Sequence, residues 1–187
     1  MTPLADYIRT AVQLRADELN IVLAQFTKRA VSKDRFVLQK GEIATQYYFI
    51  ESGALRVFYD DGERQVTGWV ALEGYYFTDL ASYRTQKPSQ FSIQAIEDTI
   101  LWTIKREKAE WLYQQVPQWQ QFTREIWENA FLRLIDGFIA FQTMTAEERY
   151  LAAMHESDLL QRLPLKDLSS FLGITPNSLS RIRKNIR

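Results

Sequence analysis

The chain has 187 residues, of which 46% are hydrophobic, 13% aromatic and 25% charged, the balance of a globular protein rather than of a disordered or fibrous one. It contains no cysteine, which excludes disulfides, thiolate metal sites, iron–sulfur clusters and cysteine nucleophiles. It contains one histidine, which excludes a metal site built from several histidines, and its 23 basic and 23 acidic side chains give no net charge.

The charges are unevenly distributed along the chain. Residues 161–187 hold six Lys or Arg side chains against one Asp, so this segment carries a net charge of +5 and residues 1–160 carry −5. A cationic segment joined to an anionic body suggests a polyanionic partner for that segment. Since no secretory signal and no apolar stretch of about 18 residues is present, we expect a cytoplasmic protein that does not bind a membrane.

In the first 104 residues, the spacing of apolar residues changes once, from helical spacing to the alternation of strands. Apolar residues between positions 4 and 30 recur at helical spacing, which predicts an N-terminal helical segment. From Arg35 onward, short alternating runs separated by turn residues predict antiparallel strands. We expect these strands over residues 35–39, 47–51, 54–59, 66–70, 91–96 and 99–104, with an Asp-Gly hairpin turn at 60–63. Such regularly spaced strands are typical of a barrel or a sandwich.

A long helix is predicted over residues 117–144, which contain one glycine and, after Pro117, no proline. At 3.6 residues per turn it has two adjoining apolar faces. One face consists of Phe122, Ile126, Ala130, Leu134 and Phe141, and the other of Trp127, Phe131, Ile135, Phe138 and Ile139. Closing a β-domain uses one face, so we expect the second to pack on the same helix of another subunit, with Trp127, Phe131, Ile135 and Phe138 in the interface. Alternatively, both faces belong to the core of one subunit.

The C-terminal segment has the pattern of a helix-turn-helix. Two short amphipathic helices are expected over 163–172 and 175–186, joined at Gly173. In the second helix, Thr175 is suited to the N-cap and Pro176 to the first helical position. Its outward positions are polar or cationic, which suits the DNA major groove. The candidate DNA-binding residues are Thr175, Asn177, Ser178, Ser180, Arg181 and Lys184.

Three sequence blocks together resemble the cyclic-AMP receptor protein (Crp/Fnr) family of bacterial transcription regulators. They are residues 40–57 (KGE, then YFIESGALRV), residues 95–102 (AIEDTILW) and residues 165–181 (LKDLSSFLGITPNSLSR). The resemblance implies an α+β fold: a β-roll effector domain over 1–116, a long dimerisation helix over 117–144 and a helix-turn-helix domain over 145–187. It also implies a homodimer that binds double-stranded DNA, and it leaves RNA polymerase open as a further partner.

The cassette that binds the cyclic nucleotide in relatives is degenerate here. Thr78 and Asp79 align with its Gly-Glu pair, and Ser89 and Gln90 with the Arg and hydroxyl residue that hold the cyclic phosphate. Neither Ser89 nor Gln90 supplies the cationic donor that such an anion needs. We therefore expect no family-like response to cyclic AMP. The neighbouring aromatic residues either line a pocket for another small effector of unknown identity or fill the core themselves. The candidate effector residues are Tyr76, Phe77, Thr78, Asp79, Ser89 and Gln90.

Compared with family members that read a guanine-containing half-site, this chain keeps only the arginine at position 181, with Pro176 and Asn177 in place of Arg and Glu. We expect Arg181 to read guanine and Asn177 to suit adenine. We expect Ser178, Ser180, Lys184 and Arg187 to contact phosphates. The leading hypothesis is a sequence-specific transcription regulator. The alternative is a sensor or protein-interaction module that has lost tight DNA binding. We expect no enzyme, since the hairpin turn alone explains the acidic residues at 60–63.

Overall fold

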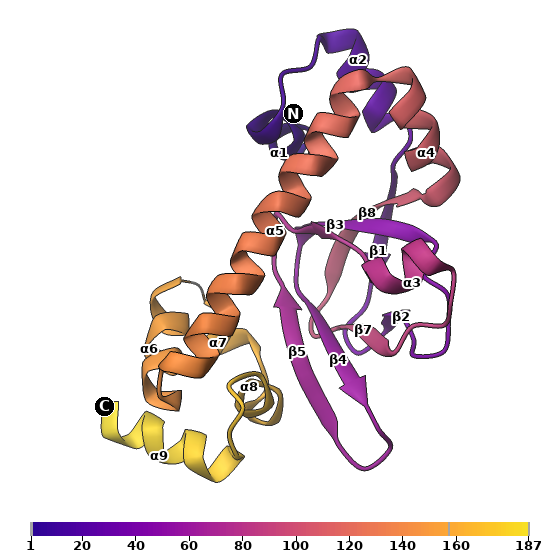
Figure 1. Cartoon of the computed structure of the whole chain (residues 1–187). Coiled ribbons are helices and arrows are strands. Elements are labelled where there is room, and N and C mark those ends of the chain that lie inside the picture. Colours follow the sequence, from indigo (N-terminus) through magenta and orange to yellow (C-terminus); the bar gives the residue numbers. More distant parts are fainter. Residues whose placement is uncertain (1, 157, 187) are drawn as a thin grey trace.

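The computed structural model describes residues 2–156 and 158–186, and Figure 1 shows its three parts: a β-roll, a long helix and a group of helices at the far end of that helix. Within these residues, no helix is both long and apolar enough to span a lipid bilayer. The elements in chain order are α1 (Pro3–Ala11), α2 (Ala16–Leu23), β1 (Thr27–Val31), β2 (Phe36–Leu38), β3 (Gln46–Ser52), β4 (Leu55–Asp60), β5 (Gln65–Ala71), β6 (Tyr76–Phe77), α3 (Leu80–Thr85), β7 (Phe91–Ala95), β8 (Thr99–Lys105), α4 (Arg106–Gln115), α5 (Pro117–Thr143), α6 (Ala146–Glu156), α7 (Leu159–Arg162), α8 (Leu165–Phe171) and α9 (Pro176–Ile186).

The β-roll consists of two four-stranded antiparallel sheets. One sheet has the strand order β1-β8-β3-β6 and the other β2-β7-β4-β5. The predicted hairpin joins β4 to β5: the carboxylate of Asp60 accepts a hydrogen bond from the Gly62 amide, and that of Asp61 accepts from Glu63 and Arg64. Backbone turn chemistry therefore explains these acidic residues, as expected.

The prediction of one helical segment from residue 4 to residue 30 is wrong at a break between residues 12 and 15 and again from residue 27 onward. The chain leaves the helix at Val12, which is extended, and forms α2 after a short break. Residues 27–31 then form β1, which pairs with β8 from Thr27↔Thr103 to Val31↔Thr99. Strand pairing with this distant partner outweighs the local helical spacing.

The main core lies between the two sheets and the helices that close the open end of the roll. Tyr48 and Phe49 of β3 and Leu101 of β8 are buried there. The first turns of α5 complete this core, with Trp119 stacked on Phe122 at a centroid distance of 4.8 Å. The N-terminal part of the long helix is thus a structural element of the effector domain.

The C-terminal half of α5 extends beyond the roll, as Figure 1 shows. Ile126 is buried, whereas Leu134 is 67% and Phe141 56% exposed, although the helical spacing predicts all three on one face. The two predicted faces therefore do not run the whole length of the helix, because the roll covers only its first half. A large apolar surface remains along the second half.

A second, smaller core holds the helix-turn-helix. It includes Leu163, Leu168, Leu172 and Leu179 from the C-terminal helices. It also includes Ala54, Val70 and Ile96, which belong to the β-roll. The C-terminal unit therefore completes its core with side chains of the effector domain.

Candidate nucleic-acid interface and effector cassette

The turn between α8 and α9 is tight and requires glycine. Gly173 has a φ of +71°, and a Cβ at this position would lie 2.9 Å from the ring of Phe141. The Ile174 amide donates to the Ser169 carbonyl at 2.9 Å, which closes the end of α8. Glycine is the residue that tolerates both this conformation and this close approach. The predicted helix-turn-helix turn at Gly173 is confirmed.

The beginning of α9 has the predicted cap. The Ser178 amide donates to the Thr175 hydroxyl at 3.2 Å, and the Leu179 amide donates to the Thr175 carbonyl at 3.0 Å. Pro176 takes the first helical position. These contacts fix where the helix starts and therefore which of its side chains point outward.

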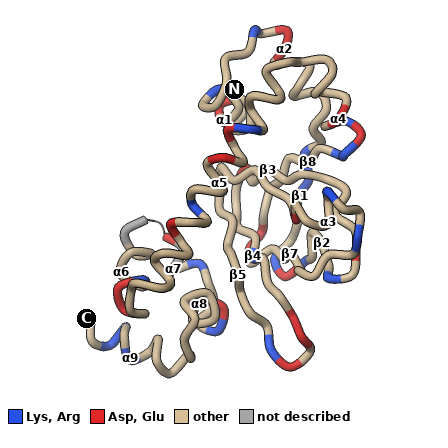
Figure 2. The backbone as a smooth tube through the Cα atoms, in the orientation of Figure 1, with Lys and Arg blue, Asp and Glu red and all other residues tan. Residues whose placement is uncertain are grey.

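One side of α9 is buried and the other carries the predicted DNA-binding side chains. Leu179 is fully buried, whereas Thr175, Asn177, Ser180, Arg181 and Lys184 are exposed and Ser178 is half-buried. The helix contains basic residues and no acidic ones (Figure 2). This face combines amide, hydroxyl and guanidinium groups, which can donate hydrogen bonds to base edges and phosphates.

The hydroxyl groups at the start of α9 lie in a row that ends at Arg181. The hydroxyls of Thr175 and Ser178 are 3.0 Å apart, and Nη2 of Arg181 lies 3.5 Å from Ser178 Oγ. The Arg183 guanidinium lies 6.0 Å from the ring centroid of Tyr150, so it points back toward α6. Arg181 and Lys184 are thus the exposed cations of α9, and the predicted phosphate contact Arg187 lies outside the described residues.

Arg149 of α6 connects the long helix to the helix-turn-helix, a contact that the sequence reasoning did not identify. Its guanidinium donates to the carbonyls of Phe141 and Met144 at the end of α5, at 3.3 and 2.6 Å. It also donates to the Leu172 carbonyl at the end of α8, at 2.9 Å. Arg149 thus ties the end of α5 to the end of α8.

The effector cassette is closed by its own side chains. Asp79 caps α3 by accepting from the Ser82 amide at 3.2 Å, and its other carboxylate oxygen accepts from the Ser89 hydroxyl at 2.5 Å. Ser89 is 2% exposed, and its hydroxyl oxygen accepts a hydrogen bond from the Phe91 amide at 3.0 Å. Asp79 and Ser89, which align with the Glu and the Arg of relatives, therefore contact each other. Here, however, the pair consists of a carboxylate and a neutral hydroxyl.

The other candidate effector residues lie in the core, except for one. Tyr76 and Phe77 are each 4% exposed, and the Thr78 hydroxyl donates to the Gln46 carbonyl at 2.8 Å. Tyr76 stacks on Tyr47 at a centroid distance of 5.0 Å. Burial raises the pKa of Tyr47 to about 12. Gln90 is exposed. These aromatic rings pack on one another, as expected if they fill the core themselves.

The two cations within the cassette segment, residues 78–90, are at the surface. Arg84, in the last turn of α3, and Lys87, in the following loop, are both exposed. A buried cyclic phosphate needs a cationic donor directed into the site, where its charge is little screened. The cassette described here offers one carboxylate and several neutral hydroxyls instead.

The candidate dimer residues lie on both the covered first half and the exposed second half of α5. Trp127 is half-buried against the roll, with its ring 6.1 Å from that of Tyr47. Phe131 and Phe138 are each 60% exposed, and Ile135 is 39% exposed. The structure thus places Trp127 at the edge of the main core and the other three on the open apolar surface.

Comparison with known proteins agrees with this geometry. The sequence family described as the cyclic nucleotide-binding domain matches residues 28–116. The transcriptional activator protein Anr of Pseudomonas protegens is 26% identical over 171 residues, which cover 82% of this chain and 68% of Anr. These matches agree with the resemblance to the Crp/Fnr family that the three sequence blocks carry.

Two solved structures share the fold of this chain. The c-di-GMP-responsive global regulator CLP of Xanthomonas campestris has a TM-score of 0.72 at 15% identity, covering 92% of this chain and 91% of CLP. FixK2 of Bradyrhizobium japonicum has a TM-score of 0.70 at 22% identity, covering 86% and 84%. The order of β-roll, long helix and C-terminal helix-turn-helix, predicted from the sequence, is therefore confirmed.

Proposed function

We propose that this chain is a dimeric, sequence-specific DNA-binding transcription regulator whose effector domain does not take cyclic AMP in the manner of the family. The observation that supports DNA binding most strongly is the outer face of α9. There Asn177, Arg181 and Lys184 are exposed on a capped helix whose inner side is held by Leu179. A rigid helix with such a face is the usual reader of a major groove.

The side chains of α9 divide into base readers and phosphate contacts. Arg181 can donate two hydrogen bonds to a guanine, and Asn177 can bond to an adenine edge. The exposed Lys184 carries a point charge suited to phosphate, which fixes the register of the helix on DNA without reading sequence. The half-site should therefore contain a guanine opposite Arg181.

The exposed half of α5 supports a homodimer. Phe131, Leu134 and Phe138 are each at least 60% exposed on successive turns of one helix. A contiguous apolar surface of this kind marks a contact with another protein surface. Two copies of α5 packed about a twofold axis would cover it and would place two recognition helices on one duplex.

The test of DNA binding uses the purified chain and pooled genomic duplex DNA, without any nucleotide, at several salt concentrations. We expect enrichment of a small set of sequences and an affinity that falls steeply with salt, since bound phosphates release counterions. Binding only at the non-specific level, with a Kd of about 10⁻⁴–10⁻⁶ M, would contradict the proposal and favour a module that has lost tight DNA binding.

Two variants separate base reading from phosphate contact. Arg181→Ala should lose about 1–3 kcal/mol of discrimination for the guanine of the enriched site. Lys184→Gln should weaken binding to all duplexes similarly and reduce the salt slope by about 0.9 per subunit, which is about 1.8 for the proposed dimer. If both variants behaved alike, the assignment of Arg181 as the base reader would be wrong.

Calorimetry tests the effector domain. A cyclic phosphate would meet Asp79 and Ser89, which are hydrogen-bonded to each other, while the cations of the cassette segment, Arg84 and Lys87, are exposed. We therefore expect no heat of binding for cyclic AMP or cyclic GMP at micromolar concentrations. Micromolar or tighter binding of either nucleotide would contradict this part of the proposal.

A further inference from the structure

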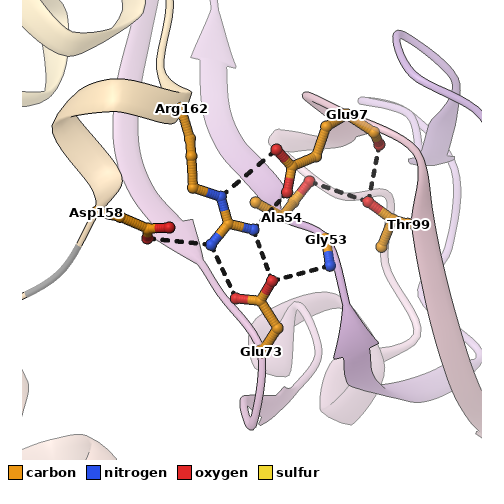
Figure 3. A network of polar contacts seen from close by, with 7 residues as sticks. All are labelled: Gly53, Ala54, Glu73, Glu97, Thr99, Asp158 and Arg162. Carbon is orange, nitrogen blue, oxygen red and sulfur yellow. Dashed lines mark hydrogen bonds and ion pairs between the residues drawn. The ribbon is translucent and has the colours of Figure 1, made fainter.

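Arg162 of α7 joins the C-terminal unit to the β-roll. Its guanidinium donates to both carboxylate oxygens of Glu73, at 2.7 and 2.9 Å, and contacts the carboxylate of Glu97 (Figure 3). It also donates to Asp158 at 3.2 Å, within its own unit. We call these four residues the Arg162 clamp. The side chain of Arg162 is only 15% exposed, so its charge is not part of the surface that the cationic C-terminal segment offers to a polyanion.

The acidic side of the clamp is rigid. Oε1 of Glu73 also accepts a hydrogen bond from the Gly53 amide at 3.1 Å. Gly53 has a φ of +92° and packs against the backbone of Asp98 and Thr99. The Thr99 hydroxyl donates to the carbonyl of Glu97 at 2.9 Å (Figure 3). Both carboxylates that receive Arg162 therefore belong to turns that the β-roll holds in place.

Two further contacts bind the β-roll to α8, the helix that supports α9. Arg56 of β4 forms an ion pair with Asp167 at 3.1 Å, with side chains only 5% and 15% exposed. The backbone amide of Thr67 in β5 donates to the Ser170 hydroxyl at 2.9 Å. A buried charge pair with hydrogen-bonded neighbours is costly to separate. The helix-turn-helix is thus attached to its own effector domain through α7 and α8.

The attachment leaves the recognition face open. The polar contacts with the β-roll described above come from Arg162, Asp167 and Ser170, none of which lies on α9. Arg181 and Lys184 remain exposed in this arrangement. The clamp therefore does not mask the DNA-binding surface, and its effect is on the orientation of α9.

We propose that Arg162 is a positioning residue for DNA binding: by holding α7 and α8 on the β-roll, it keeps α9 in one orientation without an effector. This inference rests on the proposed function. When a DNA-binding unit samples many orientations, its apparent affinity for DNA is its intrinsic affinity multiplied by the fraction of molecules in the competent orientation. Fixing that orientation in advance replaces the role that a bound effector would otherwise have.

A distance measurement tests the fixed orientation directly. The chain has no cysteine, so a pair of cysteines introduced at exposed positions can be spin-labelled selectively. Ala81→Cys on α3 and Asn185→Cys on α9 report the distance between the roll and the recognition helix, with an excess of unlabelled chain to isolate one labelled subunit. We expect a narrow distance distribution in the wild-type background without DNA. Arg162→Gln should broaden it.

Control variants separate positioning from the loss of one charge. Glu73→Gln combined with Glu97→Gln leaves Arg162 in place and should broaden the distribution as Arg162→Gln does. Lys166→Gln removes an equal charge from an exposed position of α8 and should leave the distribution narrow. Circular dichroism establishes that each variant is folded before it is labelled.

DNA binding supplies the second readout. We expect Arg162→Gln to lower the affinity for the enriched duplex about tenfold, because the competent fraction falls. The salt slope should not change, since Arg162 contacts carboxylates rather than phosphates. Arg162→Lys keeps the charge and should recover part of the affinity.

Different results would refute the clamp, the positioning role of Arg162 and the proposed function. A broad distribution in the wild type, or a narrow one that Arg162→Gln does not change, would overturn the clamp. Specific DNA binding that Arg162→Gln leaves unchanged would overturn the positioning role alone. A narrow wild-type distribution without any sequence-specific DNA binding would refute the proposed function and, with it, the role of Arg162 in DNA binding.

Discussion

Gly53 occupies a position that no other residue can take without displacing the backbone. A Cβ there would lie 2.5 Å from the Thr99 hydroxyl and 2.7 Å from the Asp98 carbonyl oxygen, at a φ of +92°. The same residue donates its amide to Glu73 of the Arg162 clamp. One glycine therefore determines both a turn of the β-roll and the place where the C-terminal unit attaches.

We predict that Gly53→Ala lowers the free energy of unfolding by the cost of a left-handed alanine, about 1–2 kcal/mol, plus about 1–3 kcal/mol of steric overlap. Gly62→Ala is the matched control, because Gly62 has a φ of +93° with nothing within 4 Å of the added Cβ. Gly62→Ala should lower the free energy of unfolding only by the cost of the left-handed alanine. Urea denaturation measures both, and equal losses would show that the contact with Thr99 is easily relieved.

At the scale of elements, α5 has two different roles along its length. Phe122 is fully buried in the main core, whereas Phe138 is 60% exposed on the same helix. Phe122→Ala should therefore destabilise the fold by about 3–5 kcal/mol. Phe138→Glu should weaken self-association instead, because it places a charge in an apolar contact.

Sedimentation over a range of protein concentrations and thermal unfolding separate these effects. We expect Phe122→Ala to lower Tm at every concentration, and Phe138→Glu to shift the monomer–dimer equilibrium toward monomer. A Phe138→Glu variant that associates as tightly as the wild type would place the dimer contact elsewhere.

The elements that were predictable from sequence depend on local signals. The hairpin between β4 and β5 follows from Asp60, Asp61 and Gly62, and the turn before α9 from Gly173 and Thr175. Strand β1 was missed because four of its five residues are exposed, so it shows no alternation. It forms only because β8 offers a pairing partner.

The outer face of α9 could be predicted from the sequence, whereas the Arg162 clamp could not. The cap of α9 and the outward Arg181 follow from helical geometry, which a sequence pattern contains. The clamp does not, because Arg162 is 89 residues from Glu73 and 65 from Glu97 in the chain. The charge of Arg162 was counted as part of the cationic segment 161–187, whereas in the structure Arg162 pairs with carboxylates of the β-roll.

At the scale of the whole molecule, the clamp predicts a pH dependence of stability. The hydrogen bonds from Arg162 hold the pKa of Glu73 below its usual 4.5. The folded state therefore favours the ionised form, and the contribution of this group is present above pH 4.5 and is lost as the pH falls through the lower folded-state pKa.

The difference in unfolding free energy between the wild type and Glu73→Gln should accordingly be constant from pH 6 to pH 8 and shrink below about pH 4.5. In an Arg162→Gln background the same comparison should show little pH dependence. Chemical denaturation at each pH measures both differences. A difference that persists unchanged to pH 3 would show that Glu73 is not stabilised as a carboxylate by Arg162.

A chain with a self-filled effector domain and a clamped helix-turn-helix should bind DNA without a cyclic nucleotide. The most direct measurement is the Kd of the wild-type chain for its enriched duplex, at one salt concentration, with and without an excess of cyclic AMP. We expect the two values to agree. A tenfold or greater tightening by cyclic AMP would contradict the claim, since it would require the nucleotide to bind preferentially to the DNA-competent state.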